Sequence, residues 1–304
     1  MTSSALPTTR SRTGKLLEYS AAIVQFVRVG VATAAAEIRL LRRQPTSFPQ
    51  LRQCETNGFS ILTNVNEDVG RSIYLSGGFE REVVRFLETN VRPEDTCFDI
   101  GANIGYFSLL MAKLASRGVV HSMEPVPFNF QLLNTNIQLN RLSNVRARML
   151  ALSDVAGTAE FTVASDGAYS SFLDTKRKPV ESRIVVETIS LDKYCEENSI
   201  ARIDCLKVDV EGAEGKVLAG ATGLLSDPAR RPRFVIMELF NPMLIQYGRD
   251  IETIVALLRD YGYEPYRDHE GHLTHFTPSD YNIFHNVFFR NEGNSEKLRL
   301  GFVK

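Results

Sequence analysis

Short apolar runs alternate with stretches of helical hydrophobic spacing along most of this chain. Residues 96–100 are short and apolar, as a buried parallel strand should be, and Phe107, Leu110 and Leu114 then recur at helical spacing. The same order returns at 118–124 and 127–140, and again at 204–210 and 211–225. Because parallel strands need a crossover helix between them, this alternation predicts an α/β fold with a mostly parallel sheet and helices on both faces.

Other segments complete the expected sheet. Residues 144–152 predict a third parallel strand, and residues 233–239 predict a fifth that precedes a helix at 251–261. Residues 157–164 and 182–189 predict two antiparallel strands on either side of a polar loop. The last strand candidate, 282–290, follows no adequate crossover helix and is therefore expected to enter the sheet antiparallel.

The first 50 residues differ from the rest in charge, with seven basic and two acidic side chains. We expect residues 1–54 to form a basic extension with one helix at 15–43, and residues 55–304 to form the main domain. The apolar segment 19–36 is interrupted by Gln25 and Arg28, so an amphipathic helix is expected rather than a membrane span. That helix is predicted to pack on the core, on a partner subunit or on a membrane surface. The remainder is acidic, which argues against a nucleic-acid partner.

The composition of 43% hydrophobic and 23% charged residues suits one large α/β core. Cys54, Cys97, Cys195 and Cys205 show no C-x-x-C spacing, so they are expected to be small core thiols. Such thiols fit a reducing, cytoplasmic compartment.

A glycine turn follows the first expected parallel strand and carries the first functional signal. The strand runs into Asp99 and turns through Gly101, Asn103 and Gly105, where glycines permit a tight turn close to a ligand. Glu124 ends the next strand, where a carboxylate can accept hydrogen bonds from ribose hydroxyls. The dinucleotide fingerprint G-x-G-x-x-G is missing, and Asp99 would repel a diphosphate but suits an ammonium group. The turn therefore favours S-adenosylmethionine over a nicotinamide cofactor.

Acidic residues mark the carboxyl ends of several expected strands, which is where open α/β sheets bind ligands. Asp209 is the first candidate for orienting or deprotonating an acceptor, Glu211 extends the acidic edge, and Glu238 is a candidate substrate contact. A hard cation held by these three acids is a weaker alternative because they show no ligand spacing. His269, His272 and His275 are expected to lie in a solvated turn rather than in a metal site. The metal requirement stays open.

Four blocks of the chain carry a family resemblance: DIGANIGYFSLL at 99–110, MEPVPFNFQLLNTNIQLN at 123–140, ALSD at 151–154 and LKVDVEGAE at 206–214. With them the chain, from about residue 78 to residue 238, resembles a class I S-adenosylmethionine-dependent methyltransferase of the FkbM family. The resemblance implies a Rossmann-like, seven-stranded sheet with a reversed last strand. It also implies a cofactor site, with Asp99 and the glycine turn around the methionine moiety, Glu124 and Pro125 at the ribose, and Ser153 and Asp154 near adenine. Glu80 is expected at the methionine end of the cofactor, and the loop 167–172 is expected to shape the acceptor pocket.

The expected activity is methyl-ether formation on a hydroxyl of a natural product or glycan, as in secondary metabolism. N-methylation of a peptide side-chain amide is the nearest alternative. A nicotinamide-dependent oxidoreductase is disfavoured by the missing fingerprint, and a non-catalytic scaffold by the intact set of Asp99, Gly101, Gly105 and Glu124. The acceptor itself and the oligomeric state do not follow from the resemblance.

Overall fold

The computed structural model describes residues 49–282 and 285–291. The expected helix at 15–43, and with it most of the basic extension, lies outside the described residues. Among those that are described, no helix is both long and apolar enough to cross a membrane. The first described strand, β1 (Leu51–Thr56), already contains residue 54, so the boundary drawn there runs through a strand that pairs with β2 (Phe59–Asn64).

The main sheet has eight strands in the order β12-β11-β13-β10-β9-β3-β4-β5. The four parallel pairings join β10 to β9, β9 to β3, β3 to β4 and β4 to β5. These strands are β3 (Thr96–Ile100), β4 (Val119–Met123), β5 (Val145–Arg148), β9 (Cys205–Val208) and β10 (Phe234–Leu239). The predicted α/β fold, with its Rossmann-like parallel centre, is confirmed. The sheet has eight strands rather than the expected seven, because β12 (His272–His275) adds an edge strand next to β11 (Tyr263–His269).

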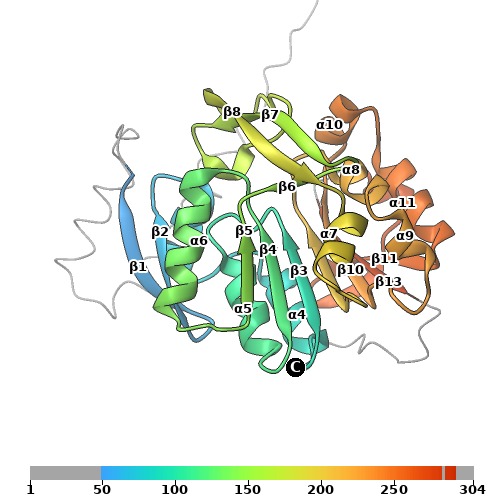
Figure 1. The fold of residues 1–304 in the computed structure, drawn as a ribbon, viewed down its shortest axis with the longest axis horizontal. Helices are drawn as coiled ribbons and strands as arrows, with labels where there is room; N and C mark the ends of the chain where they lie inside the picture. The colour runs from blue at the N-terminus through green and yellow to red at the C-terminus, as the bar shows by residue number, and fades with distance from the viewer. Residues whose placement is uncertain (1–48, 283–284, 292–304) are drawn as a thin grey trace, which may run out of the picture.

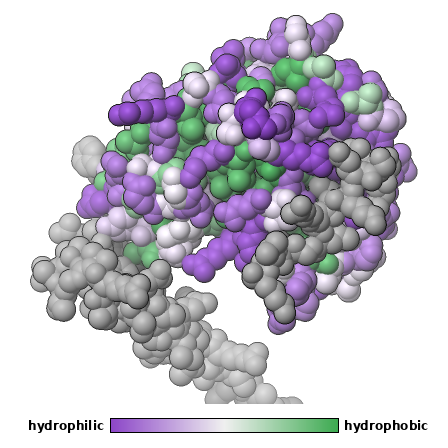
Figure 2. Space-filling model, turned by 90° about the horizontal axis from the view of Figure 1, so that it is seen from below, coloured by the Kyte–Doolittle hydropathy of each residue, from purple (hydrophilic) through white to green (hydrophobic). Residues whose placement is uncertain are grey.

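Helices cover both faces of this sheet, because alternate residues of each strand point to opposite sides. Cys97, Val120 and Ile236 pack with α4 (Arg81–Asn90) and α5 (Tyr106–Leu114). On the other face, Phe98 and Leu206 pack with α7 (Leu191–Glu197), α8 (Glu214–Ala219), α9 (Thr222–Ser226) and α11 (Ile251–Asp260). Figure 1 shows these layers, with α6 (Pro127–Leu139) beside β5 and the β1–β2 hairpin. Polar side chains form most of the surface seen from below, around a smaller apolar area (Figure 2).

The reversed last strand is confirmed, since β13 (His285–Asn291) pairs antiparallel with both β10 and β11 (Tyr263–His269). The polar turn expected at 269–275 is wrong in part. Residues 263–275 form a hairpin in which β11 pairs with β12 (His272–His275) around Gly271, whose φ of 86° is left-handed. Tyr263 and Pro265 are buried at alternate positions of β11, as expected of a strand. The prediction of a turn rested on the histidines and did not use these positions.

The single third strand expected at 144–152 is also wrong. Residues 145–148 join the main sheet as β5, whereas β6 (Ala151–Leu152) leaves it and pairs with β8 (Val180–Ile189). The antiparallel pair is confirmed as β7 (Gly157–Ala164) against β8. The resulting three-stranded sheet, β6-β8-β7, lies beyond the carboxyl ends of the parallel strands (Figure 1).

The expected role of the cysteines agrees with the structure. Cys97, Cys195 and Cys205 are buried free thiols, and Cys54 is half-buried on β1. Burial raises the pKa of Cys54 to about 11 and that of Cys195 to about 12, so neither is a reactive thiolate at neutral pH.

Candidate active site

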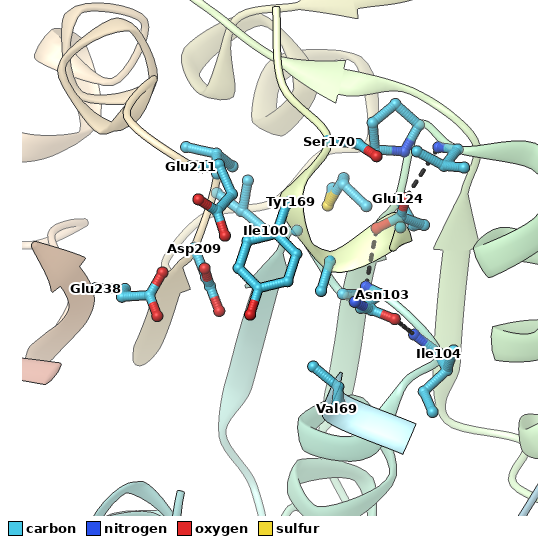
Figure 3. A pocket seen from close by; sticks show the side chains of 18 of the residues that line it. Val69, Ile100, Asn103, Ile104, Glu124, Tyr169, Ser170, Asp209, Glu211 and Glu238 are labelled. Atoms are coloured by element: carbon cyan, nitrogen blue, oxygen red, sulfur yellow. Dashed lines mark hydrogen bonds between the residues drawn. The ribbon is translucent and has the colours of Figure 1, made fainter. Parts of the chain in front are cut away.

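A cavity of about 340 Å³ opens at the carboxyl ends of the parallel strands. The glycine turn after β3, the ends of β4, β9 and β10, and the loop between β7 and β8 all contribute to its wall. In the view of Figure 3, Glu211, Asp209 and Glu238 lie on one side and Glu124 and Asn103 on the other, with the ring of Tyr169 between them. Of the predicted site residues, the lining includes Glu80, Gly101, Asn103, Glu124, Pro125, Asp209, Glu211 and Glu238.

The glycine turn is held in place by backbone contacts. Gly101 has a φ of 81°, and a Cβ there would lie 1.8 Å from the carbonyl oxygen of Asp209. Asn103, also left-handed with a φ of 50°, accepts a hydrogen bond at its own Oδ1 from the backbone N–H of Ile104. The turn therefore brings the end of β3 directly against the chain that follows β9.

Glu124 links this turn to the start of α6. Its Oε2 accepts from the N–H of Asn103 at 2.8 Å, and its Oε1 accepts from the N–H of Val126 at 2.9 Å (Figure 3). Burial raises the pKa of Glu124 to about 7, although these two hydrogen bonds favour the ionised form. The carboxylate is thus buried, oriented and within reach of the cavity.

Two residues of the predicted cofactor set lie behind the cavity wall rather than in it. Asp99 is buried on β3, and its Oδ2 accepts a 2.6 Å hydrogen bond from Ser108 on α5. Gly105 packs against α6, where an added Cβ would meet Leu133 at 2.5 Å. Neither residue is among those that line the cavity, and their role in cofactor binding stays a prediction.

Ser153 and Asp154 also lie outside the cavity lining. Ser153 donates to the Asp154 carboxylate, which in turn pairs with Lys216 at 3.2 Å. Because β6 leaves the main sheet, it is residues 150–152 that reach the cavity wall.

Three carboxylates converge on the acidic side. Single oxygens of Glu80, Asp209 and Glu238 lie within 4.8 Å of one another, which no other group of potential metal-ligating residues achieves in the part of the chain that the structure describes. Glu80 is the N-cap residue of α4, yet its side chain makes no capping hydrogen bond. The sequence predicts Glu211, not Glu80, in a group with Asp209 and Glu238. In the structure, Glu211 instead accepts from Arg177 at 2.7 Å.

A buried lysine neutralises part of this cluster and was missed by the sequence reasoning. Lys207 is 2% exposed, and its Nζ lies 2.9 Å from Oδ2 of Asp209 and 4.7 Å from the centre of the Phe107 ring. Its place inside LKVDVEGAE was the available signal, because a lysine in an otherwise apolar buried strand needs a partner. The cluster is therefore an acid–ammonium group, in which one buried ammonium contacts one of the three carboxylates.

The neighbouring acids differ in ionisation. Burial acts to raise the pKa of Asp209, but Lys207 and a hydrogen bond with Glu238 leave it below its usual value. For Glu238, burial and the charges of Asp209, Glu211 and Glu80 raise the pKa well above its usual value. Burial likewise raises the pKa of Glu80 to about 8. The ionised form is therefore favoured at Asp209 and the protonated form at Glu238.

The loop between β7 and β8 lines part of the cavity, and its role in shaping the acceptor pocket stays a prediction. Tyr169 donates to Asp68 at 2.9 Å, and the Arg177 guanidinium lies 4.2 Å from the centre of the Tyr169 ring. Ser171 contacts the hydroxyl of Tyr247 at 2.6 Å. Tyr169, Phe172 and Arg177 line the cavity, and Arg177 was another residue that the sequence reasoning missed.

None of the histidines whose side chains the structure describes lines this cavity. His121 stacks on Phe98 with ring centres 4.7 Å apart and contacts the Tyr194 hydroxyl at 3.0 Å, as expected of a satisfied core residue. Burial lowers the pKa of His121 to about 4. His272 and His275 begin and end strand β12.

The sequence matches the model of the methyltransferase FkbM domain over residues 99–265, more than half of the chain. The chain belongs to the FkbM methyltransferase family. The 31-O-demethyl-FK506 methyltransferase FkbM of Streptomyces tacrolimicus is 30% identical over 204 residues, which cover 57% of this chain and 74% of that one. The hexuronic acid methyltransferase AglP of Haloferax volcanii is 29% identical over 211 residues, covering 68% and 79%. A crystal structure of methyltransferase FkbM from Methylobacillus flagellatus KT aligns with a TM-score of 0.43 at 15% identity, over 66% of this chain and 44% of that one.

Membership of the FkbM family makes this chain an S-adenosylmethionine-dependent methyltransferase. The nicotinamide oxidoreductase and the non-catalytic scaffold are thereby set aside. The match begins at Asp99 and includes the glycine turn, Glu124 and the LKVDVEGAE block, which are the blocks that carried the resemblance.

Proposed function

We propose that this enzyme methylates a hydroxyl group of a natural product or glycan. The observation that carries the proposal is the place of Asp209 on the cavity wall: its carboxylate lies 2.9 Å from the Lys207 ammonium, and one of its oxygens lies within 4.8 Å of an oxygen of Glu238. A hydroxyl acceptor must lose its proton during methyl transfer, and a positioned carboxylate can take it.

The cavity fits S-adenosylmethionine in shape and chemistry. Gly101 and Asn103 bring backbone to one wall, and Glu124 offers a buried carboxylate for two ribose hydroxyls. The apolar residues 150–152 would lie against adenine, while the Asp154 carboxylate stays engaged with Lys216. Glu80 would lie at the positively charged methionine end.

The cofactor supplies a methyl group bound to a positively charged sulfur. Asp209 would accept the hydroxyl proton while the acceptor oxygen forms its bond to the methyl carbon and the carbon–sulfur bond breaks. The electron pair of that bond stays on sulfur, and the neutralised charge balances the proton on Asp209. Tyr169, Phe172 and Arg177 on the covering loop would exclude water and hold the acceptor in line.

The relatives support a hydroxyl acceptor. The name of one relative specifies 31-O-demethyl-FK506 as its substrate, and that of another specifies hexuronic acid. A third relative is the 2-O-methyltransferase NoeI of Sinorhizobium fredii, which is 27% identical over 192 residues. A small-molecule or glycan acceptor is therefore our working choice for this chain, with peptide amide N-methylation as the rival.

The test is an acceptor panel with methyl-labelled S-adenosylmethionine. The panel would contain neutral monosaccharides, uronic acids, a macrolide with free hydroxyls, and peptides containing asparagine or glutamine. Label on a hydroxyl oxygen, located by NMR of the product, supports the proposal. Label on a peptide amide nitrogen, with none on any hydroxyl, would overturn it in favour of the rival.

A further inference from the structure

We propose that Lys207 is a positioning residue that makes Asp209, rather than Glu238, the carboxylate that receives the acceptor proton. The inference deepens the proposed O-methylation and rests on it. Lys207 is 2% exposed on the cavity wall, and its ammonium contacts Asp209 at 2.9 Å, so it would act on the reaction through Asp209.

The strand register places Lys207 between two acids. On the parallel β3–β9 pair, Lys207 is the direct partner of Asp99, so both side chains leave the same face of the sheet. Asp209 follows two residues later, and its Oδ2 lies 2.9 Å from the Lys207 ammonium. Lys207 therefore joins a buried acid below the cavity wall to an acid that lines it.

Asp99 has a structural reason to hold this lysine. One of its oxygens accepts from Ser108, whereas Oδ1 is buried without a hydrogen-bond partner. An isolated buried carboxylate is costly, and the Lys207 charge offsets that cost. The Phe107 ring beneath Nζ adds a favourable face for the ammonium and helps to fix its direction.

The two lining acids are therefore unequal neighbours of the lysine. Asp209 has the direct ammonium contact, whereas Glu238 faces the negative charges of Asp209, Glu211 and Glu80. The charged and titratable groups that act on Asp209 are Lys207, Glu238, Arg177, Glu80, Asp99, Glu211 and Glu214. Among these, the lysine is the cation in hydrogen-bonding contact, so the asymmetry of the pair depends on it.

The decisive experiment measures the ionisation of Asp209 directly and needs no acceptor. Full-length enzyme labelled with [13Cγ]aspartate would be titrated by NMR, with the Asp209 signal assigned by its loss in Asp209→Asn. In the wild type we expect the signal to stay at its ionised position at every pH where the protein is folded. In Lys207→Met we expect the pKa of Asp209 to rise by about one to three units, because an opposite charge within a few ångströms shifts a carboxyl group by that much. Lys207→Arg should restore the ionised signal.

A second variant covers the case in which Lys207→Met does not fold, since it leaves two buried acids without their cation. The double variant Asp99→Asn/Lys207→Met removes one negative and one positive charge together, and Asp209 should titrate in it as well. An Asp209 signal that stays ionised in every folded variant without Lys207 would overturn the inference. For any hydroxyl acceptor found in the panel, the rising limb of kcat against pH should move to higher pH in Lys207→Met and return in Lys207→Arg.

The two proposals fail separately. A shifted Asp209 titration together with methylation only at amide nitrogen would overturn the hydroxyl assignment but keep the electrostatic role of Lys207. Hydroxyl methylation with an unshifted Asp209 titration would do the reverse.

Discussion

The carbonyl oxygen of Asp209 occupies the space that a side chain on Gly101 would need. Gly101→Ala would place a Cβ 1.8 Å from that oxygen at a φ of 81°. We expect it to lower the free energy of unfolding by about 3 kcal/mol or more, because backbone must move in addition to the left-handed strain.

Gly77→Ala is the matched control, since its φ is 71° but nothing lies within 4 Å of the added Cβ. Gly77→Ala should lower the free energy of unfolding by only about 1 kcal/mol. Urea unfolding of both variants measures the difference, and equal losses would show that the close approach to Asp209 is unimportant for stability.

Asp209 itself is predicted to act in turnover rather than in cofactor affinity. Asp209→Asn keeps the shape of the side chain but cannot accept a proton, so we expect kcat to fall by roughly 100-fold to 10,000-fold. Calorimetry should show S-adenosylhomocysteine binding within a few-fold of wild type.

Glu252→Gln, a substitution at an exposed position of α11, is the control and should leave kcat and the S-adenosylhomocysteine affinity unaltered. A parallel loss of S-adenosylhomocysteine affinity in Asp209→Asn would assign Asp209 to the cofactor instead.

At the scale of elements, Tyr247 connects the β7–β8 loop to the segment that follows β10 of the main sheet. The Tyr247 hydroxyl contacts Ser171 at 2.6 Å and accepts from the N–H of Leu173 at 2.9 Å. Tyr247→Phe removes both contacts, each of which is worth about 1 kcal/mol. We expect amide hydrogens of residues 168–176 to exchange about tenfold faster or more, as measured by mass spectrometry.

Tyr261→Phe, at the end of α11, is the control and should leave that loop unchanged. Unaltered exchange in Tyr247→Phe would mean that the contacts of Asp68 and Arg177 hold the loop by themselves.

At the scale of the whole molecule, buried acids set the pH dependence of stability. The pKa is raised to about 7 for Glu124 and to about 8 for Glu80 and Glu211, from an ordinary value of 4.5, with burial as the first cause in each. An acid whose folded pKa lies above its unfolded value favours the folded state below pH 4.5 and loses that contribution as pH rises through the folded pKa. These acids should therefore lower the free energy of unfolding between about pH 5 and pH 8, by up to about 1.4 kcal/mol per unit of separation for each group. His121, whose pKa is lowered to about 4, opposes them only below pH 6.5.

Chemical denaturation at pH 5.5, 7.0 and 8.5 measures this slope, and Glu124→Gln should make it shallower. S-adenosylmethionine carries a positive sulfur, so its stabilising effect should grow with pH relative to that of neutral-sulfur S-adenosylhomocysteine. A stability that rises over this range would contradict the assigned direction of these pKa shifts.

Much of the parallel sheet follows from local patterns in the chain. The spacing of apolar residues predicts β3 with α5, β4 with α6, and the reversed β13. Each of these elements shows its helix or strand periodicity within its own short stretch of sequence. The same patterns fail at β6 and at the β11–β12 hairpin, where sheet pairing with residues far along the chain decides the outcome.

The sequence by itself determined the cofactor class, the glycine turn and the acids Glu124, Asp209 and Glu238 at strand ends, because those signals lie within short, contiguous blocks. Only the tertiary structure decided that Glu80 joins the acidic cluster while Glu211 turns to Arg177. It also decided that Asp99 lies below the cavity wall with Lys207 between it and Asp209. The physical reason is that these pairings depend on strand register and on the path of a covering loop, which bring together charges that no local pattern relates.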